Sequence, residues 1–305
     1  MLRHRFPSAV VLILGLLAAM AADTVLAHRG WLPGTVLCFG LLLPFVVLAA
    51  WELEPILRGA QRPGGRRALA IGGALGLTVS ASWAYAAHHR LTLDPQLLAA
   101  TVPAIPVLLG WGLMLICRRR YSTRGITAAA LSLGLGFLFV GLPAGAWLGV
   151  RQLASPWFLA GVLLTVKACD IGAYFTGRSI GRHKWVPWVS PGKTWEGLAG
   201  GVVSAGLIAL LLHAGPWTAT DAADPLRGVP GWGVFLLGAA LGFAGQVGDL
   251  FASAFKRDAG VKDYASTIPG FGGVLDVTDS LLLTGPLVLL ALHLLRAAGH
   301  GATVG

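Results

Sequence analysis

A run of 20 residues near the C-terminus, 276–295, reads DVTDSLLLTGPLVLLALHLL. A transmembrane helix needs about 20 predominantly apolar residues to cross the hydrocarbon core of a bilayer. The run has this length, and it contains two early carboxylates, Asp276 and Asp279, whose spacing places them on one face of a helix. The stretch therefore predicts a membrane-spanning helix that carries acidic side chains at its start.

The rest of the chain repeats this apolar pattern. Of its 305 residues 55% are hydrophobic and 12% are charged, with a mean hydropathy of +0.73, whereas a soluble domain carries about 25% charged residues. This composition excludes a water-soluble enzyme, a disordered chain and a coiled coil. The sequence predicts an all-α, polytopic integral membrane protein. Its nine predicted transmembrane helices are Ser8–Leu26, Trp31–Trp51, Ala68–Ala87, Leu97–Cys117, Gly125–Gly149, Pro156–Gly177, Thr194–His213, Trp232–Phe255 and Asp276–Leu295.

These spans are expected to form one continuous membrane domain, because no internal repeat or low-complexity linker divides them. Residues 1–150 contribute about five spans, and residues 151–305 contribute a C-terminal catalytic region with about four. The first span could pass for a cleaved signal peptide, but its apolar run continues to Leu26 and favours an uncleaved helix. Glycines spaced by four predict close helix packing, as at Gly197/Gly201 and Gly238/Gly242.

The basic residues predict the orientation of the chain. If nine spans alternate, 17 of the 23 Lys and Arg residues lie on the side of the N-terminus, five lie on the other side, and Lys167 lies inside a span. Loops rich in Lys and Arg stay in the cytoplasm, so we expect the N-terminus inside and the C-terminus outside. Because these residues flank spans and form no separate basic domain, nucleic-acid binding is not expected.

Acidic residues are scarce and unevenly distributed. Of the 13, only Asp23, Glu52, Glu54 and Asp94 fall in the first 150 residues. A charge at the centre of a span costs about 2.5–3.5 kcal/mol on insertion scales, so carboxylates in or beside spans indicate a functional role. The chemistry is therefore predicted in the second half of the chain.

The strongest motif runs from Gly248 to Ser280. Asp249, Ser253 and Lys256 have the spacing of one helix face. Cations, a glycine-rich turn and two aspartates follow: Arg257, Lys262, Pro269, Gly270, Gly272, Gly273, Asp276 and Asp279. Backbone N–H groups of such a turn can approach a ligand closely. Carboxylates that hold Mg²⁺ and cations that neutralise phosphate oxygens suit transfer between phosphates.

Simpler interpretations of the same residues stay open. Asp276 could cap a helix and Asp279 could complement its dipole. The cations could be the ordinary cytoplasmic flank of a span. Each interpretation explains one feature, but together they do not explain why aspartates, cations and a glycine-rich turn occur within about thirty residues.

A second cluster occupies residues 190–197 and reads SPGKTWEG. Its Gly-Lys-Thr is not a P-loop, because the first glycine of that pattern would fall at Pro187 and no strand precedes it. Ser190, Lys193 and Thr194 can instead supply donors at the N-terminus of a helix, where the dipole favours an anion.

Two further groups have alternative interpretations. Glu196 either caps the helix that follows or belongs to the site. Lys167, Asp170 and Tyr174 share one face of a span at i, i+3 and i+7. They form either a structural Lys–Asp pair or a charged stripe that faces a polar cavity.

These motifs resemble a known family. The segment from Ser253-Ala-Phe-Lys-Arg through Pro-Gly-Phe-Gly-Gly-Val-Leu-Asp-Val-Thr-Asp-Ser is similar to that of the phosphatidate cytidylyltransferases (CDP-diacylglycerol synthases), and the resemblance covers about residues 155–290. It implies an enzyme of the bacterial inner membrane, a nucleotidyltransferase of phospholipid biosynthesis. Such an enzyme condenses CTP with phosphatidic acid to CDP-diacylglycerol and pyrophosphate, uses Mg²⁺, and is associated with a homodimer.

The resemblance also implies roles for individual residues. Asp249, Asp276 and Asp279 are the metal-associated carboxylates, and Lys256 joins them in catalysis. The residues implied to bind CTP or the lipid phosphate are Ser190, Lys193, Thr194, Ser253, Arg257, Lys262, Asp263, Asp170 and Tyr174.

Two positions depart from the family's pattern, and other functions stay open. Phe271 stands where the family usually has His, so a proton-transfer role is absent there. Val277 stands where the family usually has Arg, which is expected to weaken phosphate binding or change the preferred lipid. The alternatives are a CTP-dependent kinase of a membrane polyprenol-type alcohol, and a non-enzymatic anion transporter or scaffold.

Overall fold

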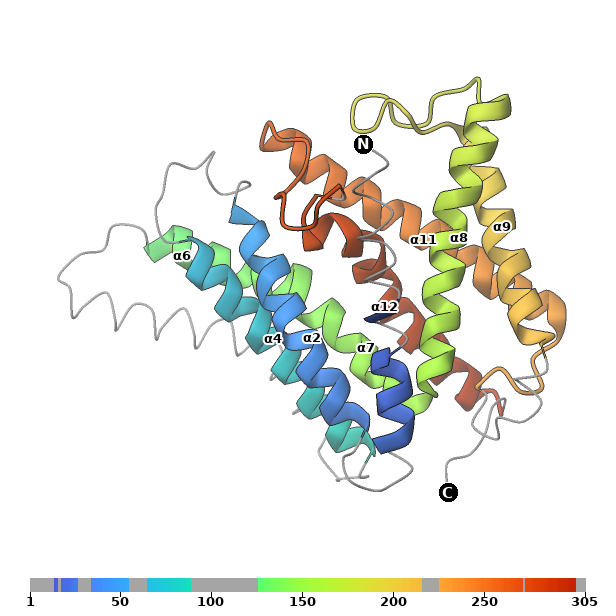
Figure 1. The fold of residues 1–305 in the computed structure, drawn as a ribbon, viewed down its shortest axis with the longest axis horizontal. Helices are drawn as coiled ribbons and strands as arrows, with labels where there is room; N and C mark the ends of the chain where they lie inside the picture. The colour runs from blue at the N-terminus through green and yellow to red at the C-terminus, as the bar shows by residue number, and fades with distance from the viewer. Residues whose placement is uncertain are drawn as a thin grey trace. The chain divides into compact units, whose positions relative to one another are not determined.

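The computed structural model describes residues 14–15, 18–26, 34–54, 65–88, 126–215, 225–270 and 272–299, and these are predominantly helical (Figure 1). The all-α class is confirmed. The main elements are α2 (Gly34–Glu52), α4 (Gly65–His88), α6 (Ile126–Leu135), the π-helix η1 (Gly136–Gly141), α7 (Leu142–Leu153), α8 (Pro156–Ile180), α9 (Trp195–His213), α11 (Gly231–Asp258) and α12 (Val274–Ala297).

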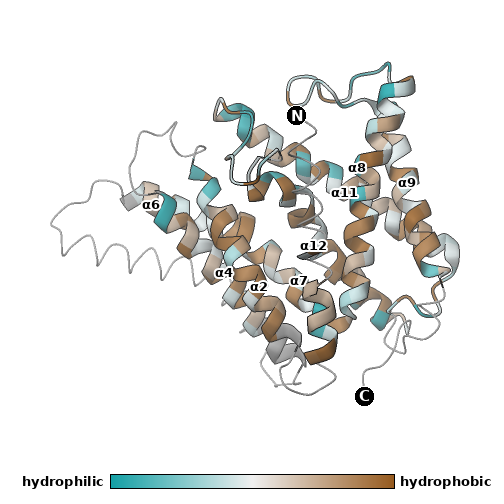
Figure 2. Cartoon of the chain, in the orientation of Figure 1, coloured by the Kyte–Doolittle hydropathy of each residue, from teal (hydrophilic) through white to brown (hydrophobic). Residues whose placement is uncertain are grey.

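Five helices in the described ranges are long and apolar enough to cross a membrane: Thr127–Leu153, Pro156–Ile180, Trp195–His213, Gly231–Asp258 and Val274–Ala297. Each overlaps a predicted span, and α2 and α4 overlap two more. Figure 2 shows the hydrophobic residues along these helices. The predicted span Leu97–Cys117 lies outside the described residues, as do residues 8–13 and 16–17 of Ser8–Leu26. The chain is thus an all-helical membrane protein, and the total of about nine spans stays a prediction.

The chain divides into two compact units. The N-terminal unit comprises residues 1–152 and 258–277, and the C-terminal unit comprises residues 153–257 and 278–305. The segment 258–277 therefore belongs with the N-terminal helices although it follows α11 in the sequence. The motif from Gly248 to Ser280 is therefore divided between the two units, with residues 258–277 in the N-terminal unit and the rest in the C-terminal unit.

Small residues bring the helices of the C-terminal unit close together. Helices α8 and α9 pack side by side (Figure 1). A Cβ added at Gly201 would lie 2.6 Å from the carbonyl oxygen of Cys169, and one at Gly242 would lie 2.6 Å from the Cβ of Ala205. A side chain at either glycine would force the helices apart. The packing role predicted for these glycines is confirmed.

The N-terminal unit is built in the same way. Helix α4 packs against η1, where a Cβ on Gly76 would lie 2.8 Å from the backbone oxygen of Phe137. Phe137 itself is fully buried. An ion pair between Arg151 Nε and Asp23 Oδ2, 2.5 Å apart, is also largely buried in this unit.

Candidate active site

The connection between α8 and α9, residues 181–194, is held as a short hairpin. The N–H of Trp185 donates to the carbonyl of Lys193 at 3.0 Å, and the N–H of Trp195 donates to the carbonyl of His183, also at 3.0 Å. These two bonds fix the backbone of Lys193 immediately before α9 begins.

The side chain of Lys193 extends from this hairpin to α11. Its Nζ lies 2.7 Å from Asp249 Oδ2, and it donates to Gln246 Oε1 at 2.9 Å and to the Gln246 carbonyl at 3.2 Å. An ammonium group has three donors, so these acceptors match it fully. Lys193 and Asp249 side chains are only 17% and 33% exposed, which reduces the screening of their attraction by water.

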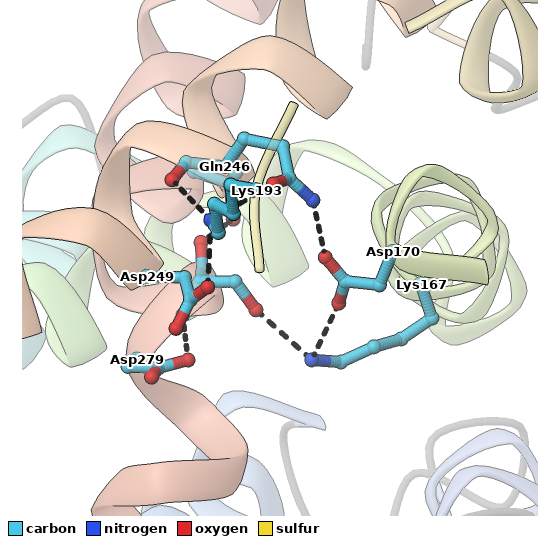
Figure 3. A network of polar contacts seen from close by, with 8 residues as sticks. Lys167, Asp170, Lys193, Gln246, Asp249 and Asp279 are labelled. Atoms are coloured by element: carbon cyan, nitrogen blue, oxygen red, sulfur yellow. Dashed lines mark hydrogen bonds and ion pairs between the residues drawn. The ribbon is translucent and has the colours of Figure 1, made fainter. Parts of the chain in front are cut away.

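Gln246 continues the network to α8 (Figure 3). This side chain is 5% exposed, and its Nε2 donates to Asp170 Oδ1 at 2.8 Å. Lys167 Nζ donates to Asp170 Oδ2 at 3.3 Å and to Ser280 Oγ, on α12, at 2.9 Å. One connected set of polar contacts therefore joins the hairpin, α8, α11 and α12.

Asp249 and Asp279 form the acidic centre of this network. Figure 3 shows a contact between their carboxylates. Glycine at position 248 permits the approach of α11 to α12, because a Cβ there would lie 3.0 Å from the carbonyl oxygen of Asp279. Lys256 is buried and interacts electrostatically with both carboxylates. Two carboxylates in contact repel each other unless a proton or a cation lies between them.

We call this set the lysine–aspartate cluster. Its members all belong to the C-terminal unit and are Lys167, Asp170, Lys193, Gln246, Asp249, Lys256 and Asp279. Lys193 pairs with Asp249 and Lys167 pairs with Asp170, while Lys256 interacts electrostatically with Asp249 and Asp279. A phosphate group can replace a carboxylate as the partner of a lysine, and the carboxylate released can then bind a cation. The cluster is therefore suited to hold anions and a cation together.

The cluster unites residues that the sequence analysis placed in three separate motifs. Of the predicted site residues it contains Asp170, Lys193, Asp249, Lys256 and Asp279. Lys167, recognised in the sequence only as part of a charged stripe, is a member. Gln246 was missed. Its signal was a polar side chain inside an apolar span, three residues before Asp249 and hence on the same helix face.

Other predicted residues of the C-terminal unit lie around the cluster. Thr194 is buried and caps α9, with its Oγ1 accepting from the N–H of Gly197 at 3.1 Å. Arg257 Nε donates to the carbonyl of Val189 at 3.2 Å, which ties the end of α11 to the hairpin. Ser190 and Ser253 are half-buried.

Tyr174 and Glu196 have partners of their own. The Tyr174 hydroxyl accepts from Arg178 Nη1 at 2.8 Å, and its side chain is largely exposed. Glu196 accepts from the backbone N–H of His183 at 3.2 Å and lies 2.6 Å from Nδ1 of the same residue. Glu196 therefore holds the start of the hairpin against the first turn of α9.

Asp276 belongs to the N-terminal unit and caps the start of α12. Its Oδ2 accepts from the N–H of Gly273 and from the N–H of Tyr264, both at 2.9 Å. Helix capping was one of the alternative interpretations of Asp276 in the sequence, and the structure shows it. A metal-binding role for Asp276 stays a prediction. The predicted residues Lys262 and Asp263 lie exposed in the same unit.

The glycine-rich turn also forms its bonds within the protein. Gly270 and Gly272 have φ values of 84° and 96°, in the region that favours glycine. Ile268 and Gly272 exchange backbone hydrogen bonds of 2.7 and 3.2 Å. The sequence predicted that N–H groups of this turn approach a ligand, whereas those of Gly272 and Gly273 bond to the chain itself. Phe271 lies outside the described residues, and Val277 is half-buried.

The donor groups can be compared with what Mg²⁺ requires. Among the described residues no group of three or more His, Cys, Asp or Glu side chains is close enough to hold a metal ion. Protein sites usually bind Mg²⁺ through one or two carboxylates, with substrate phosphates and water completing the shell. The contact between Asp249 and Asp279 meets this requirement, and a cation between them would remove their repulsion.

Comparison with known proteins identifies the family. A family model described as the cytidylyltransferase family matches residues 4–295. The chain belongs to this family. The resemblance predicted from the sequence motifs is thereby confirmed, and it extends over the N-terminal helices as well.

Several bacterial proteins are similar to the chain. The phosphatidate cytidylyltransferase of Pseudomonas aeruginosa is 41% identical over 176 residues, which cover 56% of this chain and 59% of the relative. The phosphatidate cytidylyltransferase of Haemophilus influenzae is 43% identical over 126 residues, covering 41% and 42%. The uncharacterized protein YnbB of Escherichia coli is 38% identical over 167 residues, covering 53% and 52%. The chain thus spans about half the length of these curated relatives.

Proposed function

We propose that the protein is a CTP:phosphatidate cytidylyltransferase that forms CDP-diacylglycerol and pyrophosphate. Membership of the cytidylyltransferase family and relatives named phosphatidate cytidylyltransferase support this activity. The observation that carries the proposal is the lysine–aspartate cluster. In it, Lys193 pairs with Asp249, Asp249 contacts Asp279, and Lys256 interacts electrostatically with both carboxylates. An enzyme that joins two phosphate compounds needs both kinds of group at one place.

In the proposed reaction, a phosphate oxygen of phosphatidic acid attacks the α-phosphorus of CTP. A new P–O bond forms there, and the bond from the α-phosphorus to the oxygen bridging the α- and β-phosphates breaks, so that pyrophosphate leaves. The attacking phosphate is already an anion near neutral pH, since the second pKa of a phosphomonoester is about 6. The reaction therefore needs no strong general base, and a chain with Phe271 can carry it out.

The main task of the protein is to hold two anions that repel each other. Lys193 is fixed at its backbone by the hairpin and at its side chain by Gln246. In the proposal it exchanges Asp249 for a phosphate oxygen of CTP. Lys256 and Lys167 lie on the neighbouring helices and neutralise further oxygens. Holding reactants in this way lowers the entropic part of the barrier.

We further propose that Asp249 and Asp279 hold Mg²⁺. When bound, the ion supplies a positive charge that stabilises the charge developing on the transferring phosphate. The carboxylates fix its place, Gln246 and Lys193 orient Asp249, and the buried position of Asp279 limits access of water.

The orientation and assembly of the chain complete the proposal. The excess of Lys and Arg on one side supports an N-terminus and active-site loops in the cytoplasm. That side gives access to CTP. The homodimer implied by the family resemblance is tested by the mass of the purified protein in detergent.

A labelling experiment tests the proposed reaction. The purified protein is supplied with phosphatidic acid, Mg²⁺ and CTP labelled either at the α- or at the γ-phosphate. We expect the α-label to enter the lipid fraction and the γ-label to leave as pyrophosphate. A CTP-dependent kinase would instead transfer the γ-label to a lipid alcohol. Absence of lipid labelling from both nucleotides would contradict either enzyme.

Lys193→Met is the variant that connects this reaction to the cluster. We expect a loss of rate on the order of 100-fold, because one positive charge at the reacting phosphates is removed. Lys184→Met is the matched control, since Lys184 is an exposed lysine of the same hairpin. Equal rates of the two variants would contradict the role given to Lys193.

A further inference from the structure

Glu52, the last residue of α2, is buried at 6% exposure and bonds to a distant part of the sequence. Its Oε1 accepts from Thr267 Oγ1 at 2.6 Å and from the N–H of Val274 at 3.0 Å. Its Oε2 accepts from the N–H of Leu275 at 2.8 Å. All of these residues belong to the N-terminal unit. One carboxylate therefore binds three donors of the motif that runs into α12.

These contacts satisfy the start of α12. The first N–H groups of a helix have no partner within the helix, and a negative charge is favoured there by the helix dipole. Glu52 accepts from the N–H groups of Val274 and Leu275, while Asp276 accepts from that of Gly273. The first turn of α12 is therefore fixed by two carboxylates, and one of them comes from α2.

Gly273 provides the space for this arrangement. A Cβ built at Gly273 would lie less than 3 Å from the Glu52 carboxylate, and Gly273 does not have a positive φ. Alanine can therefore adopt the backbone conformation at this position, but its methyl group would displace the Glu52 carboxylate. The absence of a side chain here is required by the contact with Glu52.

We propose that Glu52 is a positioning residue for the active site. It sets the first turn of α12, and with it Asp276 and, one turn further along the same helix, Asp279. This inference rests on the proposed cytidylyltransferase activity, in which Asp279 holds the metal ion. It assigns a role in the reaction to a residue of the N-terminal helices, where the sequence analysis expected no chemistry.

Glu52→Gln tests the proposal, because the glutamine retains the size of the side chain. Both carboxylate oxygens of Glu52 accept hydrogen bonds, whereas only the amide oxygen of glutamine can do so. The NH₂ group of the glutamine would face a group that is itself a donor. We expect kcat to fall about tenfold or more, as for small misplacements of reacting groups, with KM for CTP changed less than about twofold. Glu54→Gln is the matched control, since Glu54 lies two residues away and pairs with Arg66. It is expected to retain the wild-type kcat.

Thr267 gives a second and milder test. Thr267→Val removes the hydroxyl that donates to Glu52 while retaining the shape of the side chain, and Thr267→Ser restores the hydroxyl. We expect a kcat loss of roughly threefold in the valine variant, on the order of one hydrogen bond, and wild-type kcat in the serine variant. This pair keeps the proposal testable if Glu52→Gln fails to fold.

A double-mutant cycle tests whether Glu52 and Gly273 act through the same contact. Gly273→Ala and Glu52→Gln are each expected to lower kcat, and the double variant is expected to be no slower than the slower single variant, because both changes disrupt one contact. Rates are measured per folded molecule, well below each melting temperature.

Wild-type kcat in Glu52→Gln, or multiplying losses in the double variant, would overturn the proposal. A wild-type protein that forms no CDP-diacylglycerol would instead contradict the proposed function. The two failures are therefore distinguishable.

Discussion

Two groups of carboxylates in this protein have different kinds of partner. In the C-terminal unit, Asp170 and Asp249 bind lysine ammonium groups and a glutamine amide. In the N-terminal unit, Glu52 and Asp276 accept chiefly from backbone N–H groups at the start of α12. A lysine side chain can change partners by rotation about its single bonds, whereas a backbone N–H in the first turn of a helix moves only with that helix. The first group is suited to exchanging ligands and the second to holding a position.

The contrast is sharpest between Asp276 and Asp279, which lie three residues apart in one helix. Asp276 accepts from two backbone N–H groups. Asp279 is 6% exposed and contacts the carboxylate of Asp249. Both are aspartates of one sequence motif, and the resemblance of that motif to the phosphatidate cytidylyltransferases implied a metal-associated role for both. Two aspartates of one motif therefore have different partners in the structure, which makes different tasks for them a testable prediction.

The largest effect that would sharpen this contrast is expected from Asp279→Asn. The rate of CDP-diacylglycerol formation should fall about 100-fold or more, because one of the two carboxylates proposed to hold Mg²⁺ loses its charge. The melting temperature should stay unchanged or rise, since the asparagine amide can donate to Asp249 and removes the repulsion between two carboxylates. Asp258→Asn, an exposed change at the end of α11, is the control. A parallel loss of stability and rate would place Asp279 with the structural carboxylates.

Gln246→Leu should have the next largest effect, because it breaks the link between Lys193 and Asp170. We expect a loss of kcat/KM for CTP of about tenfold, since Lys193 loses one of its three acceptors and Asp170 loses the amide that links it to Lys193. Steady-state rates at varied CTP concentration provide the measurement. Gln246→Glu retains the acceptor for Lys193 but places a negative charge beside Asp170, and it should be intermediate. Wild-type kcat/KM in Gln246→Leu would show that Lys193 is oriented without this bridge.

Asp276→Asn should cost less, roughly threefold to tenfold in rate. The asparagine oxygen can still accept from Gly273 and Tyr264, and the loss of an N-terminal charge or cap is typically about 1 kcal/mol. The concentration of Mg²⁺ that gives half the maximal rate should stay close to the wild-type value. A large increase in that concentration would instead make Asp276 a metal ligand and would remove the distinction drawn between Asp276 and Asp279.

The smallest effect is expected from Ser280→Ala, which removes one acceptor from Lys167 and leaves Asp170 as its partner. We expect a rate loss of roughly threefold, equivalent to about 0.6 kcal/mol. Thr284→Val, one turn along α12, is the control, because the Thr284 hydroxyl donates to backbone carbonyl groups. Equal rates of the two variants would show that the contact of Lys167 with Ser280 has no part in turnover.

The positions of the helices were largely predictable from the sequence. The predicted span Pro156–Gly177 corresponds to α8, and Thr194–His213 corresponds to α9. Helix ends were also predictable where a cap is local, as at Thr194. The site was predictable in part. An ion pair joins Lys193 to Asp249, but these residues lie 56 positions apart, in motifs that the sequence analysis treated separately. No local rule connects residues at that separation, because their contact depends on how α8, α9 and α11 pack.

The sequence by itself determined that the chain is an all-helical membrane protein. It also determined where the membrane helices of the described ranges lie and which charged residues are candidates for chemistry. Length and hydropathy suffice for this because each membrane helix satisfies its own backbone hydrogen bonds. The tertiary structure decided which candidates are in contact. Gln246 bonds to both Lys193 and Asp170, and Glu52 accepts hydrogen bonds from the first turn of α12. Those choices depend on contacts between helices far apart in the sequence, which local periodicity does not encode.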